Sequence, residues 1–166
     1  MFKYGCLLCL LCAAFSCKQP QQQHIDKTGS TAHPPDISLD EFKHLDWIVG
    51  NWKTQVEGPG FYQDIRFTND STLEIRSYQL NGKDTSNTNL ASLFWRNQHL
   101  YMGVNAEWVV VSMTDSTLRL DPVRQGWLAI DWKKNSQEEW TMTHSKTDFR
   151  RSIKMKRQPA LEELMK

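Results

Sequence analysis

The sequence has no cysteine beyond residue 17, and neither sign of charge is in marked excess. Its four cysteines, Cys6, Cys9, Cys12 and Cys17, all lie at the N-terminus, so the rest of the chain has no thiol for a disulfide or a cysteine-bound metal. The formal net charge is +1, from 20 Lys and Arg against 19 Asp and Glu. Nucleic acids and strongly anionic membrane surfaces attract proteins that carry a concentrated basic field. The near-neutral balance therefore argues against either as the main partner.

Long apolar runs are also missing, with one exception at the N-terminus. Lys3 precedes roughly a dozen mostly apolar residues that end in small ones, which is typical of a secretory signal and too short for a membrane-spanning helix. The end of this run, Ala14-Phe15-Ser16-Cys17, resembles a bacterial lipobox, in which the cysteine receives diacylglycerol and becomes the mature N-terminus. We therefore expect a signal peptide over residues 1–16 and lipidation of Cys17. An ordinary cleaved signal and an uncleaved anchor are the alternatives.

The segment after Cys17 has almost no apolar side chains and is rich in Gln, Pro, Ser and Thr. Such a composition cannot bury enough surface to fold, so residues 17–37 are expected to form a flexible tether with a reach on the order of 25 Å. By similarity to bacterial lipoprotein sorting, Lys18 directly after the cysteine implies the outer membrane of the cell envelope. The acidic run that resembles the surface-export signal of some lipoproteins is missing, which favours the periplasmic side. The lipid bilayer, held through an acylated Cys17, is then the expected membrane partner.

Residues 38–166 are expected to form one domain that consists mainly of short strands. Ser38 and Glu41 form a capping-box pattern that predicts a short helix, and Gly50 ends it. A second short helix is expected after Pro159. Spacing this short leaves no room for crossover helices, so a parallel sheet is excluded and an antiparallel barrel or sandwich remains. Ten strands are predicted, at residues 51–57, 61–68, 72–80, 88–95, 99–104, 108–114, 117–121, 127–133, 138–145 and 149–157.

Three of the predicted hairpins have a register that is internally consistent. With Thr68 opposite Thr72, one register satisfies two apolar pairs and two charge pairs, which a random sequence would rarely do. These pairs are Phe67 with Leu73, Ile65 with Ile75, Arg66 with Glu74 and Asp64 with Arg76. The other two hairpins pair Met113 with Leu118, Val111 with Leu120, Trp95 with Leu100 and Leu93 with Met102. A meander of hairpins follows from these registers.

The last three strands contain the candidate binding residues. Alternation places Leu128, Ile130 and Trp132 on one face, Trp140, Met142 and His144 on one face, and Phe149, Arg151, Ile153 and Met155 on one face. If these are the inner faces, His144 and Arg151 point inward among large apolar neighbours. That combination suits an anionic amphiphile, with a carboxylate head on an apolar body. The alternative places Arg151 at the mouth with its head in water and His144 at a strand end as a satisfied histidine.

The stretch Trp47-Ile48-Val49-Gly50-Asn51-Trp52 follows the expected helix and leads into the first strand. It resembles the Gly-x-Trp of lipocalins and, more closely, the Trp-Leu-x-Gly-x-Trp opening of nitrobindin-like barrels. The resemblance implies an up-and-down antiparallel β-barrel of about 8–10 strands, closed at one end by the helix. It implies that Gly50 allows a tight turn, that Trp52 packs across the barrel floor and that Trp47 caps the same end. Nitrobindin-like proteins bind haem through a late histidine, for which His144 is the candidate, so haem is a minor alternative.

Motifs for catalysis are missing. The sequence has no Gly-x-Ser-x-Gly, no phosphate-binding loop and no His-Glu-x-x-His, and its five histidines are scattered. We therefore expect no catalytic residues, no metal site and no cofactor. The expected function is binding of a small hydrophobic or amphiphilic ligand in the cell envelope. A barrel packed solid that acts as a scaffold through unknown protein partners is the alternative. The residues expected to contact the ligand are Trp52, Trp132, Trp140, Met142, His144 and Arg151.

Overall fold

The computed structural model describes residues 34–56, 60–81, 84–160 and 163. The expected signal peptide, Cys17 and most of the expected tether lie outside these described residues. Most of the helix expected after Pro159 also lies outside them. The described chain begins at Pro34 and contains the predicted short helix and all ten predicted strands.

The helical segment before the barrel consists of two consecutive short helices. The α-helix α1 (Leu39–Lys43) begins at the predicted capping box. The Ser38 side chain accepts a hydrogen bond from the backbone N–H of Glu41, and the Glu41 carboxylate accepts one from the backbone N–H of Ser38. The 3₁₀-helix η1 (His44–Ile48) follows directly, and strand β1 begins at Gly50. The predicted helix is therefore present, but its second half has the tighter 3₁₀ winding.

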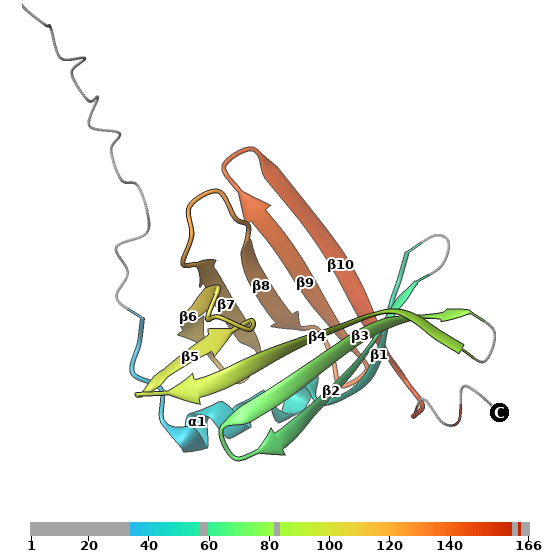
Figure 1. Ribbon diagram of the computed structural model, residues 1–166, viewed down its shortest axis with the longest axis horizontal. Helices are drawn as coiled ribbons and strands as arrows, with labels where there is room; N and C mark the ends of the chain where they lie inside the picture. The colour runs from blue at the N-terminus through green and yellow to red at the C-terminus, as the bar shows by residue number, and fades with distance from the viewer. Residues whose placement is uncertain (1–33, 57–59, 82–83, 161–162, 164–166) are drawn as a thin grey trace, which may run out of the picture.

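The ten strands form a closed antiparallel barrel in which each strand pairs with its sequence neighbours and β1 pairs with β10. This confirms the predicted up-and-down barrel (Figure 1). The strands are β1 (Gly50–Thr54), β2 (Phe61–Asn69), β3 (Thr72–Asn81), β4 (Asp84–Arg96), β5 (His99–Met102), β6 (Trp108–Met113), β7 (Thr117–Pro122), β8 (Ala129–Lys134), β9 (Glu139–Lys146) and β10 (Phe149–Gln158).

Most of the predicted registers are confirmed, and two differ by one residue. All four apolar and charge pairs between β2 and β3 are present, as are both pairs between β4 and β5 and the pair of Met113 with Leu118. However, Asn69 rather than Thr68 pairs with Thr72, and Val110 rather than Val111 pairs with Leu120. Each difference has the same cause, a register shift that leaves one extra residue on one strand, as in a β-bulge.

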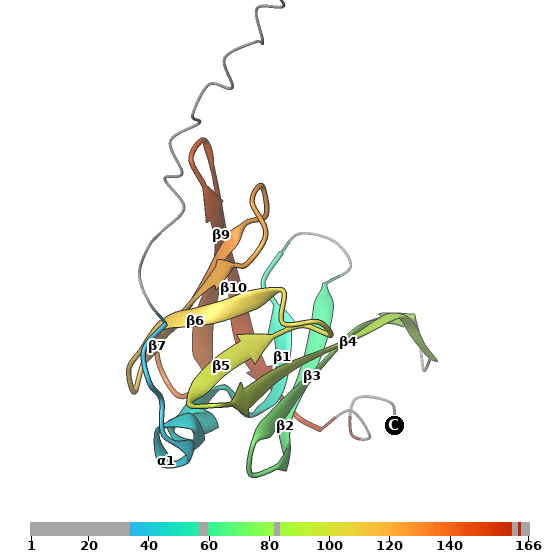
Figure 2. The same ribbon diagram turned by 60° about the vertical axis from the view of Figure 1, so that its left-hand side comes forward.

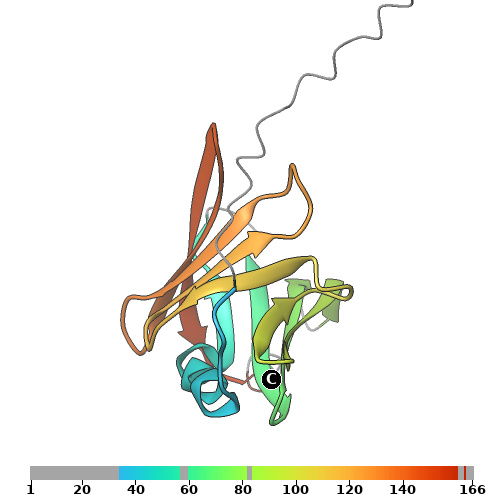
Figure 3. The same ribbon diagram turned by 90° about the vertical axis from the view of Figure 1, so that its left-hand side faces the viewer.

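The two ends of the barrel differ, because the strands alternate in direction around it. The helical segment and the β2–β3, β4–β5, β6–β7 and β8–β9 connections lie at one end, which we call the closed end. His44 Nδ1 is 3.3 Å from a carboxylate oxygen of Asp115 in the β6–β7 turn, which ties the helices to this end. The other five connections lie at the opposite end, which we call the open end. Figures 2 and 3 show the helices at the bottom of the barrel and the β7–β8 and β9–β10 connections at its top.

The core fills the closed end of the barrel. Trp140 is 1% exposed, and its ring centroid lies 5.5 Å from that of Trp132 and 6.1 Å from that of Trp52. Trp47 packs edge-on against Trp140 from the helical side, at 6.5 Å between centroids. The indole N–H of Trp52 donates to the Ile48 carbonyl at 2.7 Å. Trp52 therefore packs across the floor and Trp47 caps it, in the positions that the resemblance implied.

The folded unit begins before Ser38. Ile37, at the end of the expected tether, is 4% exposed and belongs to the core. Its backbone N–H donates to the Gln98 carbonyl at 2.7 Å, and its carbonyl accepts from the Trp95 indole at 2.6 Å. All buried residues of the core cluster lie between Ile37 and Met155, so residues 34–166 contain the whole described core.

Candidate functional site

Strands β8, β9 and β10 share an inner wall whose exposure increases from the closed end to the open end. Trp140 and Met155 are cross-strand partners near the closed end and are 1% and 0% exposed. The next pair on this face is partly buried. In the layer above, His144 is partly buried between Ile130 of β8 and Arg151 of β10, and Arg151 is exposed. The barrel interior is thus filled at the closed end and accessible at the open end.

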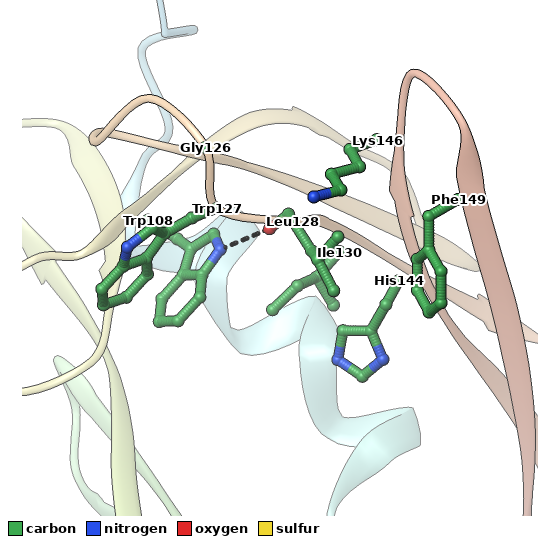
Figure 4. A pocket seen from close by; sticks show the side chains of 8 residues that line it. All are labelled: Trp108, Gly126, Trp127, Leu128, Ile130, His144, Lys146 and Phe149. Carbon is green, nitrogen blue, oxygen red and sulfur yellow. Dashed lines mark hydrogen bonds between the residues drawn. The ribbon is translucent and has the colours of Figure 1, made fainter.

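An open pocket of about 560 Å³ lies at the top of this wall, between β6, the β7–β8 connection, β8, β9 and the start of β10. Its volume lies within the range of small-molecule sites, and its lining is mostly apolar. Figure 4 shows two indole rings on one side and Phe149 on the other, with Ile130 and His144 between them. The lining residues are Trp108, Gly126, Trp127, Leu128, Ile130, His144, Lys146 and Phe149.

Trp108 and Trp127 form an apolar wall. The ring centroids of Trp108 and Trp127 lie 5.0 Å apart with their planes tilted by 54°. The indole N–H of Trp108 donates to the Leu128 carbonyl at 2.9 Å (Figure 4), which ties β6 to the end of the β7–β8 connection. Trp108 is therefore held in place, whereas Trp127 is 41% exposed and leaves its outer face accessible. Such a wall suits the alkyl or ring portion of a ligand.

The polar side of the pocket is basic. Burial lowers the pKa of the His144 imidazole, and the positive charge of Arg151 opposite lowers this pKa further. The imidazole is consequently neutral at pH 7, with one nitrogen able to donate and the other able to accept a hydrogen bond. Lys146, which faces Phe149 across the β9–β10 ladder, contributes an ammonium group to the lining. The arrangement places the exposed Lys146 ammonium and a neutral imidazole beside an apolar wall, with the exposed Arg151 next to the imidazole on β10.

The residues expected to contact a ligand do not all lie in this pocket. Trp52, Trp132 and Trp140 are buried in the core below it. Met142, the cross-strand partner of Trp132, packs against that core and is partly buried. Of the six expected residues, His144 lines the pocket, and Arg151 faces His144 from the next strand. The expected inner faces of β8, β9 and β10 are thus correct. On these faces, the side chains nearer the closed end are buried and those nearer the open end are accessible to solvent.

Sequence reasoning missed Trp108, Trp127 and Lys146. Trp127 lies in a connection, next to Gly126 with φ +89°, and alternation along a strand does not place such a residue. The predicted meander could have indicated that these residues lie close together. Once strand order and direction are known, the β7–β8 connection and the starts of β6 and β10 must meet at the end opposite the helix.

No group of three or more His, Cys, Asp or Glu side chains in the described ranges is placed to hold a metal ion. In the same part of the chain, no helix is long and apolar enough to span a membrane.

Comparison with protein-family models gives no match, and comparison with curated proteins also gives none. Among solved structures, a redesigned β-barrel is similar to 69% of this chain and to 95% of its own length, with 11% sequence identity and a TM-score of 0.36.

Proposed function

We propose that this protein binds a small amphiphile with an apolar body and an anionic head in the pocket at the open end of its barrel. The observation that carries this proposal is the pairing of an aromatic wall, Trp108 and Trp127, with the basic side chains of Lys146 and Arg151. The apolar body would lie against the indoles, and the head would accept hydrogen bonds from the cations and from the neutral His144.

The filled floor supports a short ligand site. Trp132 and Met142 lie one layer below Ile130 and His144 on the same inner face, so they close the pocket about 7 Å further down the strands. A ligand that extends beyond the pocket would therefore have its remainder outside the open end rather than deep in the barrel. This geometry favours a partly enclosed acyl chain or ring over a fully enclosed one.

The test is native mass spectrometry of residues 34–166, purified gently from cells that make the protein, followed by a fluorescence titration with palmitate. We expect a retained or readily taken up anionic lipid. Phe149→Ala should weaken palmitate binding about tenfold, because it removes a lining ring. Phe61→Ala is the matched control, since Phe61 is similarly exposed, at 45% against 41%, and does not line the pocket.

Each other outcome of this experiment identifies an alternative. A retained haem would assign His144 the role that the nitrobindin-like resemblance implied. No retained molecule and no uptake of lipid or haem would overturn the proposal and favour a scaffold that acts through protein contacts.

We further propose that the barrel is lipocalin-like and is anchored as a lipoprotein through Cys17 to the outer membrane, facing the periplasm. The support is the lipobox-like Ala14-Phe15-Ser16-Cys17 after an apolar run, with Lys18 next to the cysteine. Metabolic labelling with tritiated palmitate should label the full chain and not its Cys17→Ser variant. Equal labelling of both would exclude acylation at Cys17.

A further inference from the structure

Exposed large apolar side chains gather at the open end of the barrel. Among the described residues, seven such side chains are exposed, and six of them lie in connections or strand starts at this end. The exception is Leu90 of β4. The next residue, Ala91, pairs with the inward Ile75, so alternation along the strand places Leu90 on the outer face. The six are Val56, Phe61, Val104, Val123, Trp127 and Phe149, with exposed fractions from 41% to 83%.

Basic side chains lie among these apolar ones. We call residues 103–107, 123–128 and 146–151 the rim; these are the β5–β6 and β7–β8 connections and the β9–β10 tip. The rim contains four basic and two acidic residues, a formal charge of +2. One of the two acids, Glu107, accepts a hydrogen bond from the backbone N–H of Asn105 at 2.9 Å, within its own connection. The basic residues, all exposed, are Arg124, Lys146, Arg150 and Arg151.

The helical segment and the connections at the closed end have the opposite charge. Residues 36–48 and the connections 70–71, 97–98, 114–116 and 135–138 together contain seven acidic residues and one lysine, a formal charge of −6. The rim and these connections therefore carry opposite formal charges although the overall net charge is +1, and basic residues at the closed ends of the strands, among them Arg96, Lys134 and Arg157, reduce the contrast. An anionic surface would attract the rim and repel the closed end, which fixes the orientation of the molecule.

We propose that the rim docks onto the surface of a lipid bilayer that contains anionic lipids, with the pocket mouth against the membrane. Trp127 and Phe149 would enter the headgroup region, where aromatic side chains are favoured, and Val104 and Val123 would bury beside them. Arg124 and Arg150 would contact lipid phosphates. The proposal does not depend on the pocket holding a ligand, since Val104, Val123, Arg124 and Arg150 do not line it.

The experiment measures co-sedimentation of residues 34–166 with vesicles of phosphatidylethanolamine with or without about one third phosphatidylglycerol. A cooperative thermal transition is checked first for each variant. We expect binding to the anionic vesicles that weakens as NaCl is raised. Arg124→Glu with Arg150→Glu should weaken binding about 25-fold or more, since each basic residue near an anionic surface contributes about fivefold. Lys43→Glu with Lys133→Glu makes the same charge change away from the rim and should leave binding within about twofold.

A second pair of variants tests the apolar contact. Val123→Glu should weaken vesicle binding about tenfold, because it places a charge where an apolar side chain would be buried. Leu90→Glu, which changes a similarly exposed side chain on the barrel wall, should have little effect.

Absence of vesicle binding would overturn the proposal, and so would equal losses in rim and control variants. If the protein self-associates without vesicles and only the rim variants abolish this association, the surface binds a second copy of the chain instead. Palmitate uptake without vesicle binding would leave the proposed function standing and reject this inference alone.

Discussion

His144 and Arg151 face each other across the β9–β10 ladder, at the layer where the inner wall changes from buried to exposed. Partial burial of the imidazole lowers the pKa of His144, and the charge of Arg151 lowers it further. Neither effect could be read from the sequence, because burial depends on how far the barrel is filled below this layer and the charge effect depends on the β9–β10 register.

The lowered pKa predicts how stability depends on pH. Since the folded protein binds this proton less readily than the unfolded chain, the free energy of unfolding should fall as the pH drops below about 6.5, and this loss should level off below the folded pKa. His144→Gln should flatten the change of melting temperature between about pH 7 and pH 5. Arg151→Gln should raise the pKa of His144 in a proton NMR titration. An unchanged pKa in this variant would contradict the pairing.

Arg151 should also discriminate between ligands by charge. Arg151→Ala is expected to weaken palmitate binding about tenfold, because a charge-assisted contact to the head is lost, and to change hexadecanol binding little. Arg150→Ala is the control, since Arg150 pairs with Ser145 and points to the other face of the sheet. Equal effects of Arg151→Ala on both ligands would reject a role in head recognition.

The tryptophan cluster should dominate the stability of the barrel. Trp140→Ala should lower the free energy of unfolding by about 3–5 kcal/mol, because a fully buried indole in contact with three other rings is replaced by a cavity. Trp127→Ala, at a side chain that is 41% exposed, should lower it by less than about 1 kcal/mol. Urea unfolding measures both, and similar losses would show that the cluster is not the centre of the core.

Substitutions at Gly50 and Gly126 distinguish the cost of backbone strain from the cost of a steric clash. Both have positive φ, +129° and +89°. A Cβ on Gly50 would lie 2.5 Å from the Arg157 guanidinium, whereas one on Gly126 would meet nothing within 4 Å. Gly126→Ala should therefore lower the free energy of unfolding by about 1 kcal/mol and Gly50→Ala by more. Combining Gly50→Ala with Arg157→Ala should recover part of the extra loss, and strict additivity in this double-mutant cycle would exclude the conflict.

The fold was predictable because its signals are local. Alternation, turn residues and cross-strand pairs predicted ten strands, and β1 to β10 all occur at the expected places. The predictions failed at Thr68 and Val111, where an added residue shifts the register without a recognisable motif. The pocket was less predictable, because Trp127 and Lys146 become neighbours only through the arrangement of connections at one end. Alternation gives the inner face, and the depth of a residue on that face depends on the whole barrel.

The pairing of β1 with β10 has a consequence for how the chain folds. Trp52 pairs with Arg157, whose guanidinium stacks on the Trp52 ring at 4.3 Å and donates to the Val49 carbonyl. The seam thus joins segments about 100 residues apart, and such distant contacts form late and slowly. A chain that ends before β10 leaves β1 and β9 as two unpaired edges, which invite association with other chains. Pairing of β10 with both β1 and β9 is therefore the step that removes the two edges and closes the sheet into a barrel.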